Sequence, residues 1–298
     1  METVTRDNMK SIAIVTDSNS GITQEEGKKL GIYVIPMPFT IDGREYLEDI
    51  SITQEEFFKL LESGADVKTS QPSRAYLEEL WGDLLKTYGQ IIYIPMTSGL
   101  SATCENAKRY AAQFKGKVRV VDNLRISVPQ KISVYEALNM AKAGKSVDEI
   151  LKHLEETKGK CSIYLTVSEL KYLKKGGRIT PAAAAIGDML KLKPILFTRG
   201  DRFDKFAVVR SMGQAKKKMI QRIKTELETE FKNEYEQGKM ALLVAYSKNG
   251  EEGKAFAEEI EQEFDGMKVL YVDPLSLSIA CHTGAGALGI GVCVCDYI

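Results

Sequence analysis

Apolar and polar positions follow one another along this chain in a regular first half and a less regular second half. Short apolar runs at 11–15, 91–94 and 117–121 each precede a polar loop and then residues with helical spacing. Apolar runs of this length between turn residues are typical of strands in a parallel sheet. The repeated order of strand, loop and helix predicts a parallel sheet flanked by helices.

Turn and cap residues place the shorter elements of the first half. Thr53 with Glu56 three positions later predicts a capping box, and Thr23 with Glu26 predicts another helix start. Residues 32–39 predict one further strand, at an edge or exit of the sheet because it contains two prolines. The Asp-Gly pair at 42–43 predicts a hairpin after that strand.

The second half has mixed element order. We expect strands at 161–167, 240–246, 267–272 and 289–295, a hairpin formed by 194–198 and 203–209, and a long helix at 211–232. This order predicts a second, mixed α/β domain, so we expect domains at 1–158 and 159–298. Pro181 begins an alanine-rich helix over 182–190, whose small side chains suit either close helix packing or an apolar ligand.

Composition narrows the class of protein. The 298 residues are 44% hydrophobic and 28% charged, as in soluble globular proteins, and 41 Lys+Arg balance 41 Asp+Glu. This balance weighs against a nucleic-acid partner. No apolar run reaches the ~18 residues of a membrane helix, and the N-terminus lacks a signal-peptide pattern. We therefore expect a cytoplasmic protein, for which Met9 is an alternative start.

Hydroxyl side chains crowd the turn after the apolar run at 91–94. Thr97, Ser98, Ser101 and Thr103 surround Gly99 where a strand passes into a helix. Backbone N–H groups and the helix dipole favour an anion at such a turn. Capping the helix needs one hydroxyl, and four are present, so the pattern favours a ligand. A second hydroxyl loop, at 69–73, is expected to face the same cleft.

The glycine motif near the C-terminus and the cysteines do not predict a cofactor or metal site. Residues 284–289 match G-x-G-x-x-G, but a strand follows them where a dinucleotide site needs a helix. The pattern leaves His282 accessible beside a glycine-rich segment, whereas His153 is expected to be solvated on a charged helix. The five cysteines lack a metal-finger spacing, so we expect buried, inert thiols and no metal site.

Seven stretches of the chain together resemble the DegV family of bacterial lipid-binding proteins. They occur in the family's order and span nearly the whole sequence, which makes the combination more specific than any single motif. The stretches are Thr16-Asp17-Ser18, Thr69-Ser70-Gln71-Pro72-Ser73, Thr97-Ser98-Gly99-Leu100-Ser101, Val121-Asp122, Lys174-Lys175-Gly176-Gly177-Arg178-Ile179, Lys193-Pro194-Ile195-Leu196 and His282-Thr283-Gly284-Ala285-Gly286.

The resemblance implies a two-domain α/β fold with a long-chain fatty acid buried between the domains. Thr69, Ser98 with the adjoining Gly99, and His282 would bind the carboxylate, and no cofactor is implied. Such proteins present the acid to a separate fatty-acid kinase, which forms the acyl-phosphate. Transient contact with a membrane surface is compatible with this role. The chain itself lacks the P-loop motif of a phosphoryl-transfer enzyme.

The sequence leaves open the role of two arginines and an alternative function that uses one of two serines. Arg178 and Arg210 are expected to be mobile or exposed, either as ordinary surface charges or as groups that bind the kinase or the phosphorylated product. The alternative function is a small-molecule enzyme that uses Ser98 or Ser101 in acyl or phosphoryl chemistry. No nucleophile elbow is present and no base is placed by the sequence, which weighs against that alternative.

Overall fold

Three sheets organise the chain. The computed structural model describes residues 10–186 and 192–298. A four-stranded parallel sheet has the order β2-β1-β6-β7, a three-stranded antiparallel sheet the order β4-β3-β5, and a six-stranded mixed sheet the order β10-β9-β8-β13-β11-β12. The α/β class, with a parallel sheet followed by a mixed sheet, is as the sequence predicts. The alanine-rich helix predicted over 182–190 lies partly outside the described residues.

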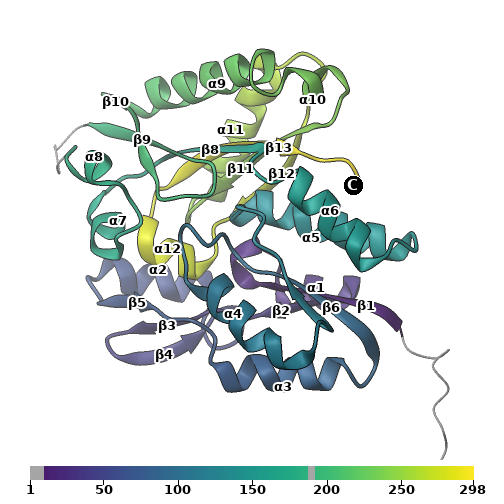
Figure 1. Cartoon of the computed structure of the whole chain (residues 1–298). Helices are drawn as coiled ribbons and strands as arrows, with labels where there is room; N and C mark the ends of the chain where they lie inside the picture. The colour runs from purple at the N-terminus through teal and green to yellow at the C-terminus, as the bar shows by residue number, and fades with distance from the viewer. Residues whose placement is uncertain (1–9, 187–191) are drawn as a thin grey trace, which may run out of the picture.

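The elements before residue 158 form the first two sheets and their helices (Figure 1). In order they are β1 (Lys10–Asp17), η2 (Ser18–Ser20), α1 (Gln24–Leu30), β2 (Ile32–Ile35), β3 (Pro38–Ile41), β4 (Arg44–Leu47), α2 (Gln54–Glu62), β5 (Val67–Thr69), α3 (Arg74–Leu84), β6 (Tyr88–Ile94), α4 (Thr103–Ala111), η3 (Ala112–Phe114), β7 (Val118–Val120), α5 (Ser127–Lys142) and α6 (Val147–Glu156).

The elements after residue 158 form the mixed sheet and the helices that cover it. In order they are β8 (Cys161–Thr166), α7 (Lys171–Gly176), α8 (Pro181–Ala184), β9 (Lys193–Thr198), β10 (Asp204–Val209), α9 (Met212–Glu228), α10 (Lys232–Glu236), β11 (Met240–Tyr246), α11 (Gly250–Glu263), β12 (Val269–Pro274), α12 (Leu277–Thr283) and β13 (Leu288–Val294). The two large sheets thus divide near the predicted boundary at 158, which stays a prediction.

Local sequence explains most element boundaries. The Thr53 hydroxyl accepts the Glu56 N–H, and the Glu56 carboxylate accepts the Thr53 N–H, which is the predicted capping box. The expectation of one strand over 32–39 is wrong. Pro36 interrupts the run, and the two halves join different sheets as β2 and β3. Proline lacks the N–H that a continuous ladder needs.

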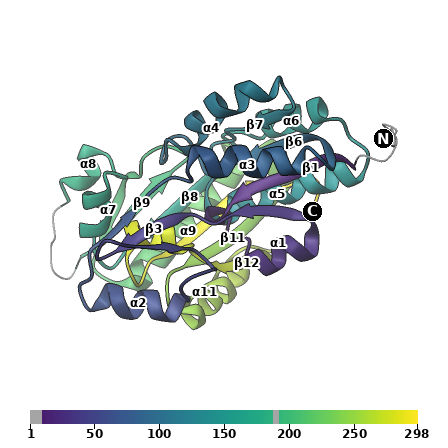
Figure 2. The ribbon, with the colours of Figure 1, turned by 90° about the horizontal axis from the view of Figure 1, so that it is seen from below.

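Helix α5 lies between the parallel sheet and the mixed sheet (Figures 1 and 2). One side of the helix packs on Ile14, Ile92 and Ile94 of the parallel sheet. Its first two turns pack on the mixed sheet, where Val128 and Ile132 contact a cluster with small side chains. Helices α3 and α4 cover the other face of the parallel sheet, and α9 and α11 cover the other face of the mixed sheet.

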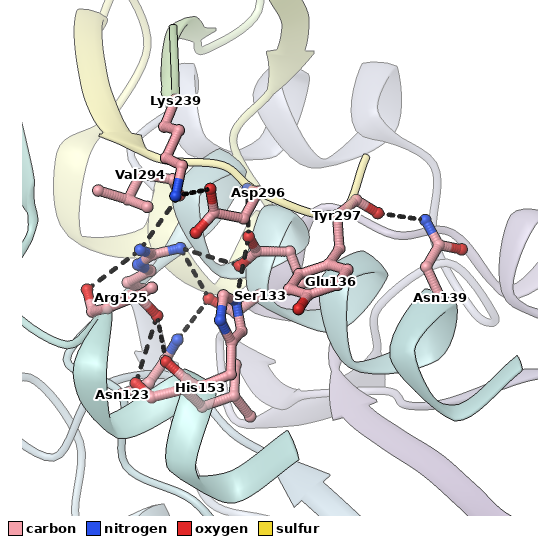
Figure 3. A network of polar contacts seen from close by, with 12 residues as sticks. Asn123, Arg125, Ser133, Glu136, Asn139, His153, Lys239, Val294, Asp296 and Tyr297 are labelled. Carbon is pink, nitrogen blue, oxygen red and sulfur yellow. Dashed lines mark hydrogen bonds and ion pairs between the residues drawn. The ribbon is translucent and has the colours of Figure 1, made fainter. Parts of the chain in front are cut away.

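A buried polar network joins α5 to the C-terminal segment (Figure 3). The Arg125 guanidinium is fully buried, donates to Ser133 Oγ at 3.0 Å and lies 3.9 Å from the Glu136 carboxylate. Glu136 also accepts the backbone N–H of Asp296 at 2.8 Å. The expectation of a solvated His153 is wrong: its side chain is 11% exposed, because Glu136 and the Tyr297 ring cover it.

Candidate ligand-binding site

A cavity of about 370 Å³ lies at the junction of all three sheets. The end of β5 contributes Thr69, the turn after β6 contributes Met96 and Ser101, and the segment after α7 contributes Arg178. The end of α12 contributes His282. Carboxyl ends of parallel strands commonly form ligand sites, since the loops that follow them converge there. The cavity therefore joins residues that lie more than two hundred positions apart in the sequence.

Thr69 and His282 form a hydrogen-bonded pair in the cavity wall. Thr69 Oγ1 lies 3.0 Å from His282 Nε2. The imidazole packs against Gly176, where any β-carbon would collide with Nδ1. A side chain at position 176 would thus displace the ring, so the glycine of the Lys-Lys-Gly-Gly stretch fixes the position of His282. Thr69 and His282 were each expected at the carboxylate, and the structure brings their side chains together; their contact with a ligand stays a prediction.

Burial keeps His282 uncharged at physiological pH. Desolvation lowers the pKa of its imidazole to about 4, and the positive charge of Arg178 lowers it further. In the tautomer that carries the proton on Nε2, the ring donates to Thr69 Oγ1. The Thr69 hydroxyl then has its own proton to donate to another acceptor. The pair can therefore present a hydrogen-bond donor to a ligand without adding a buried charge.

Arg178 supplies the positive charge of the cavity. Its Nε donates to the Leu100 carbonyl at 3.2 Å, and its Nη1 donates to the Gly176 carbonyl. Burial lowers the pKa of the guanidinium, and Arg202 adds to this effect. The expectation of a mobile or exposed Arg178 is therefore wrong, because the chain turns its side chain inward after α7. Arg210, at the far end of β10, is exposed as expected.

The hydroxyl-rich turn after β6 has structural partners of its own. Thr97 Oγ1 donates to the Gly200 carbonyl at 2.5 Å, and Ser101 Oγ lies 2.9 Å from Thr103 Oγ1. A β-carbon at Gly99 would collide with the same Gly200 carbonyl. The glycine thus permits close approach of the hairpin between β9 and β10. Protein partners thus account for the hydroxyls of Thr97 and Thr103, so these two do not add to the argument for a ligand.

Ser98 and Gly99 do not line the cavity, although both residues were predicted to contact the ligand. The Ser98 N–H donates to the Asp122 carboxylate at 3.3 Å, and Gly99 faces the hairpin. Of the predicted carboxylate ligands, the structure brings Thr69 and His282 together. Ser101 does reach the cavity.

Buried acids behind the cavity hold its walls in place. The Glu48 carboxylate accepts the Ser18 hydroxyl at 2.7 Å and the Leu277 N–H at the start of α12. Burial raises the pKa of Glu48 to about 7. Burial likewise raises the pKa of Asp17 to about 6, although the N–H of Met96 donates to it at 2.9 Å. These contacts fix the start of α12, whose last turn carries His282.

A second cavity, of about 40 Å³, adjoins the first. The two share Ile126, Phe203, Ile279 and Thr283 as wall residues. The second cavity continues between α5 and the mixed sheet, and its other side chains are almost all apolar. A cavity with polar groups in part of its wall, adjoining an apolar one, suits a ligand with a small polar head and a hydrocarbon tail.

Sequence reasoning missed the apolar residues of both cavities. Ile126, Phe203 and Ile279 come from a loop, a strand start and a helix, and they meet only in the folded chain. One signal was available in the last strand, where glycine alternates with large aliphatic residues over 288–292. The alanine-rich helix lines neither cavity among its described residues, since Ala183 packs in a hydrophobic cluster with Phe203.

The cysteines are buried or partly buried thiols. Among the described residues, one group could place ligand atoms together around a metal, namely Cys104, Glu105 and Asp122. Burial raises the pKa of the Cys104 thiol to about 12, which disfavours the thiolate that binds metals. The glycine motif at 284–289 precedes β13 and no helix, so its context differs from that of a dinucleotide site, as the sequence predicts.

The chain is similar to known proteins over nearly its whole length. The family model "Uncharacterised protein, DegV family" matches residues 11–294. A DegV domain-containing protein of Clostridium perfringens is 32% identical over 290 residues, which cover 95% of this chain and 97% of that protein.

Solved structures with fatty-acid ligands in their descriptions also match. A structure described as fatty acid binding of a DegV family protein from Thermus thermophilus has a TM-score of 0.83 at 27% identity, covering 95% of this chain and 99% of that one. DegV of Bacillus subtilis, described as a fatty acid binding protein, has a TM-score of 0.81 at 29% identity, covering 96% and 99%.

Fold and site together define an α/β protein with two adjoining cavities where its parallel and mixed sheets meet. Within the part of the chain that the structure describes, no helix has the length and apolar character needed to cross a membrane. With the family match over residues 11–294 and the overall structural similarity, this chain belongs to the DegV family.

Proposed function

We propose that this protein binds one long-chain fatty acid, with the carboxylate at the polar wall of the larger cavity and the tail running past Ile126 and Phe203 so that its end reaches the apolar cavity. The observation that carries the proposal is that the two cavities adjoin through shared wall residues, since the larger one offers polar donors and the smaller one is lined almost wholly by hydrocarbon. The fatty acids named for the Thermus and Bacillus relatives support the same ligand class.

The carboxylate is held by a neutral donor and a cation. Thr69 donates its hydroxyl proton while it accepts from His282 Nε2 at 3.0 Å. Two nitrogens of Arg178 donate to backbone carbonyls, which orients the guanidinium and leaves Nη2 for the ligand. Hydrogen bonds to a charged group contribute about 1.5–3 kcal/mol each, more than neutral ones. Ser98 and Gly99 remain predicted contributors, through movement of the turn toward the bound head group.

The tail supplies most of the binding energy. Each methylene group that leaves water contributes about 0.8 kcal/mol, so a palmitate-like tail gains roughly 10 kcal/mol before the costs of association. The walls that Ile126, Phe203 and Ile279 share between the cavities are apolar and therefore suit the first part of this tail. Along its length, the bound tail would exclude water from the space between the parallel and the mixed sheet.

The protein would act as a carrier that presents the acid to a separate fatty-acid kinase for acyl-phosphate formation. The chain carries no P-loop motif of its own, so the phosphoryl donor would bind to the partner. Arg210 is exposed and is available to a partner surface. A transient contact with a membrane would deliver or remove the lipid.

An enzyme using Ser98 or Ser101 is less well supported. A serine nucleophile needs a general base within hydrogen-bond reach. The hydroxyl partner of Ser101 is Thr103, and the imidazole of His282 is bonded to Thr69. Neither serine is therefore paired with a histidine in the described structure.

Titration of delipidated protein with palmitate tests the proposal. We expect a saturable rise in melting temperature with palmitate and a smaller rise with methyl palmitate, which has the same tail without the charge. Equal shifts for acid and ester would show that the polar cavity does not bind the carboxylate. No shift with palmitate or with oleate would contradict fatty-acid binding.

A further inference from the structure

Glycine alternates with large aliphatic residues along β13, the strand between β8 and β11 in the mixed sheet. Leu288, Ile290 and Val292 pack in the core beneath α9 and α11. Successive side chains of a strand point to opposite faces, so Gly289 and Gly291 face α5 and the apolar cavity, whose wall they form. The cavity face of this central strand thus lacks side chains at two consecutive positions.

The two glycines have different explanations. At Gly289 a β-carbon would lie 3.0 Å from the Tyr164 carbonyl and 3.1 Å from a Leu165 methyl, so close packing of the neighbouring strand restricts this position. At Gly291 a β-carbon would meet Pro129, Leu243 and the Ser162 carbonyl at 3.6–3.7 Å, which are ordinary contacts. Position 291 therefore has room for a methyl group.

The backbone does not require glycine at 291 either. Gly291 is not among the described glycines with positive φ. Glycine inside a strand weakens it, because the residue loses more conformational freedom on folding and offers no side chain to pack. Glycine at 291 therefore costs strand stability although neither φ nor a clash of the β-carbon demands it, and its distinguishing feature is its place in the wall of the apolar cavity.

We propose that Gly291 sets the longest acyl chain that this protein accepts. The proposal rests on the proposed function, since it assumes that the tail enters the apolar cavity. Ile126, Phe203 and Thr283 belong to the wall nearest the carboxylate site, because they also line the first cavity. Gly291 lies farther along β13, opposite Pro129 of α5, and so borders the end of the tail.

A side chain at 291 would shorten the cavity without touching the carboxylate site. The β-carbon of an alanine would lie in contact with Pro129 and Leu243, and the two methyl groups of a valine would need space beyond these contacts, at the expense of the cavity. The cavity is only about 40 Å³, so either change removes a large share of its volume. Thr69, His282 and Arg178 belong to other elements and keep their contacts.

Binding of laurate, myristate, palmitate and stearate should be measured for wild type, Gly291→Ala and Gly291→Val. Gly213→Ala is the matched control, because its added β-carbon would have no neighbour within 4 Å and lies on α9, away from both cavities. We expect Gly291→Val to bind stearate about tenfold more weakly, the loss of roughly two buried methylene groups, with laurate affinity unchanged. Gly291→Ala should lose less affinity than Gly291→Val, and its loss should likewise be greatest for stearate and least for laurate.

Folding and function can fail separately in this experiment. The melting temperature of delipidated Gly291→Ala should equal or exceed that of wild type, since alanine loses less conformational freedom on folding than glycine, whereas Gly291→Val also presses on Pro129 and Leu243 and loses part of this gain. An unchanged chain-length profile, or an equal loss for all four acids, would overturn the role of Gly291 while leaving fatty-acid binding intact. If wild type binds none of the four, the proposed function itself fails.

Discussion

Replacement of Thr69 by valine removes one hydroxyl from the carboxylate site and leaves a side chain of nearly the same shape. The hydroxyl lies 3.0 Å from His282 Nε2, and we propose that its proton goes to the ligand carboxylate. Loss of such a bond should cost about 1–3 kcal/mol, which weakens palmitate binding roughly five- to 150-fold. Methyl palmitate should lose less, since it offers an uncharged acceptor.

Thr225→Val provides the matched control. Thr225 lies on α9, and its hydroxyl donates to the Gln221 carbonyl of the same helix at 3.0 Å. Isothermal titration with delipidated protein would compare the two variants, with circular dichroism to confirm that both fold. Palmitate affinity within twofold of wild type in Thr69→Val would refute the assignment of the pair. Ser98→Ala should lose less affinity than Thr69→Val, because Ser98 does not line the cavity.

The remaining predictions concern charged groups and thiols. Arg178→Ala should weaken palmitate binding in a titration, because Arg178 lines the cavity. Arg210→Ala should keep palmitate affinity and change only kinase-coupled turnover. Equal palmitate affinity in the two variants would contradict the assignment of Arg178 to the carboxylate site. Burial raises the pKa of Glu48 from 4.5 to about 7, so ionisation of this carboxyl destabilises the fold as the pH rises through this range. Glu48→Gln has no such charge, so by pH 7 its free energy of unfolding should exceed that of wild type by up to about 3 kcal/mol more than at pH 4.5, as urea unfolding would measure. If the difference in free energy of unfolding between Glu48→Gln and wild type is the same at pH 4.5 and pH 7, the raised pKa of Glu48 is refuted. Arg125→Ala should lower the free energy of unfolding by about 3–5 kcal/mol, because it leaves the Glu136 carboxylate buried without its guanidinium partner, although the Asp296 N–H still donates to it; a loss below 1 kcal/mol would show that water replaces the guanidinium. EDTA should leave the melting temperature unchanged, and stoichiometric zinc by elemental analysis would show that the thiols were misjudged.

Local patterns predicted the elements well because their causes are local. The capping box at Thr53, the glycine stop after α7 and the Asp-Gly hairpin each depend on residues a few positions apart. The split of 32–39 into β2 and β3 was missed, since the proline signal for an edge does not say which sheet each half joins. That choice depends on pairing with distant strands.

The candidate site was predicted in part. Thr69 and His282 were chosen through the family resemblance, and they do meet in the cavity wall. The direction of Arg178 could not be read from its neighbours alone, because one of the two carbonyls that hold it belongs to Leu100 on a distant segment. His153 looked solvated on a charged helix, yet the distant C-terminal segment covers it. Side-chain direction and burial are set by tertiary contacts that spacing does not reveal.

The most direct test of fatty-acid binding is the lipid content of the protein as purified. The recombinant chain would be extracted with organic solvent and the extract analysed by mass spectrometry, with a matched extract of an unrelated protein from the same host. We predict a long-chain fatty acid at close to one molecule per chain, since a buried tail at about 0.8 kcal/mol per methylene should survive purification. An extract without fatty acid, from protein whose melting temperature also does not respond to palmitate or oleate, would contradict the account.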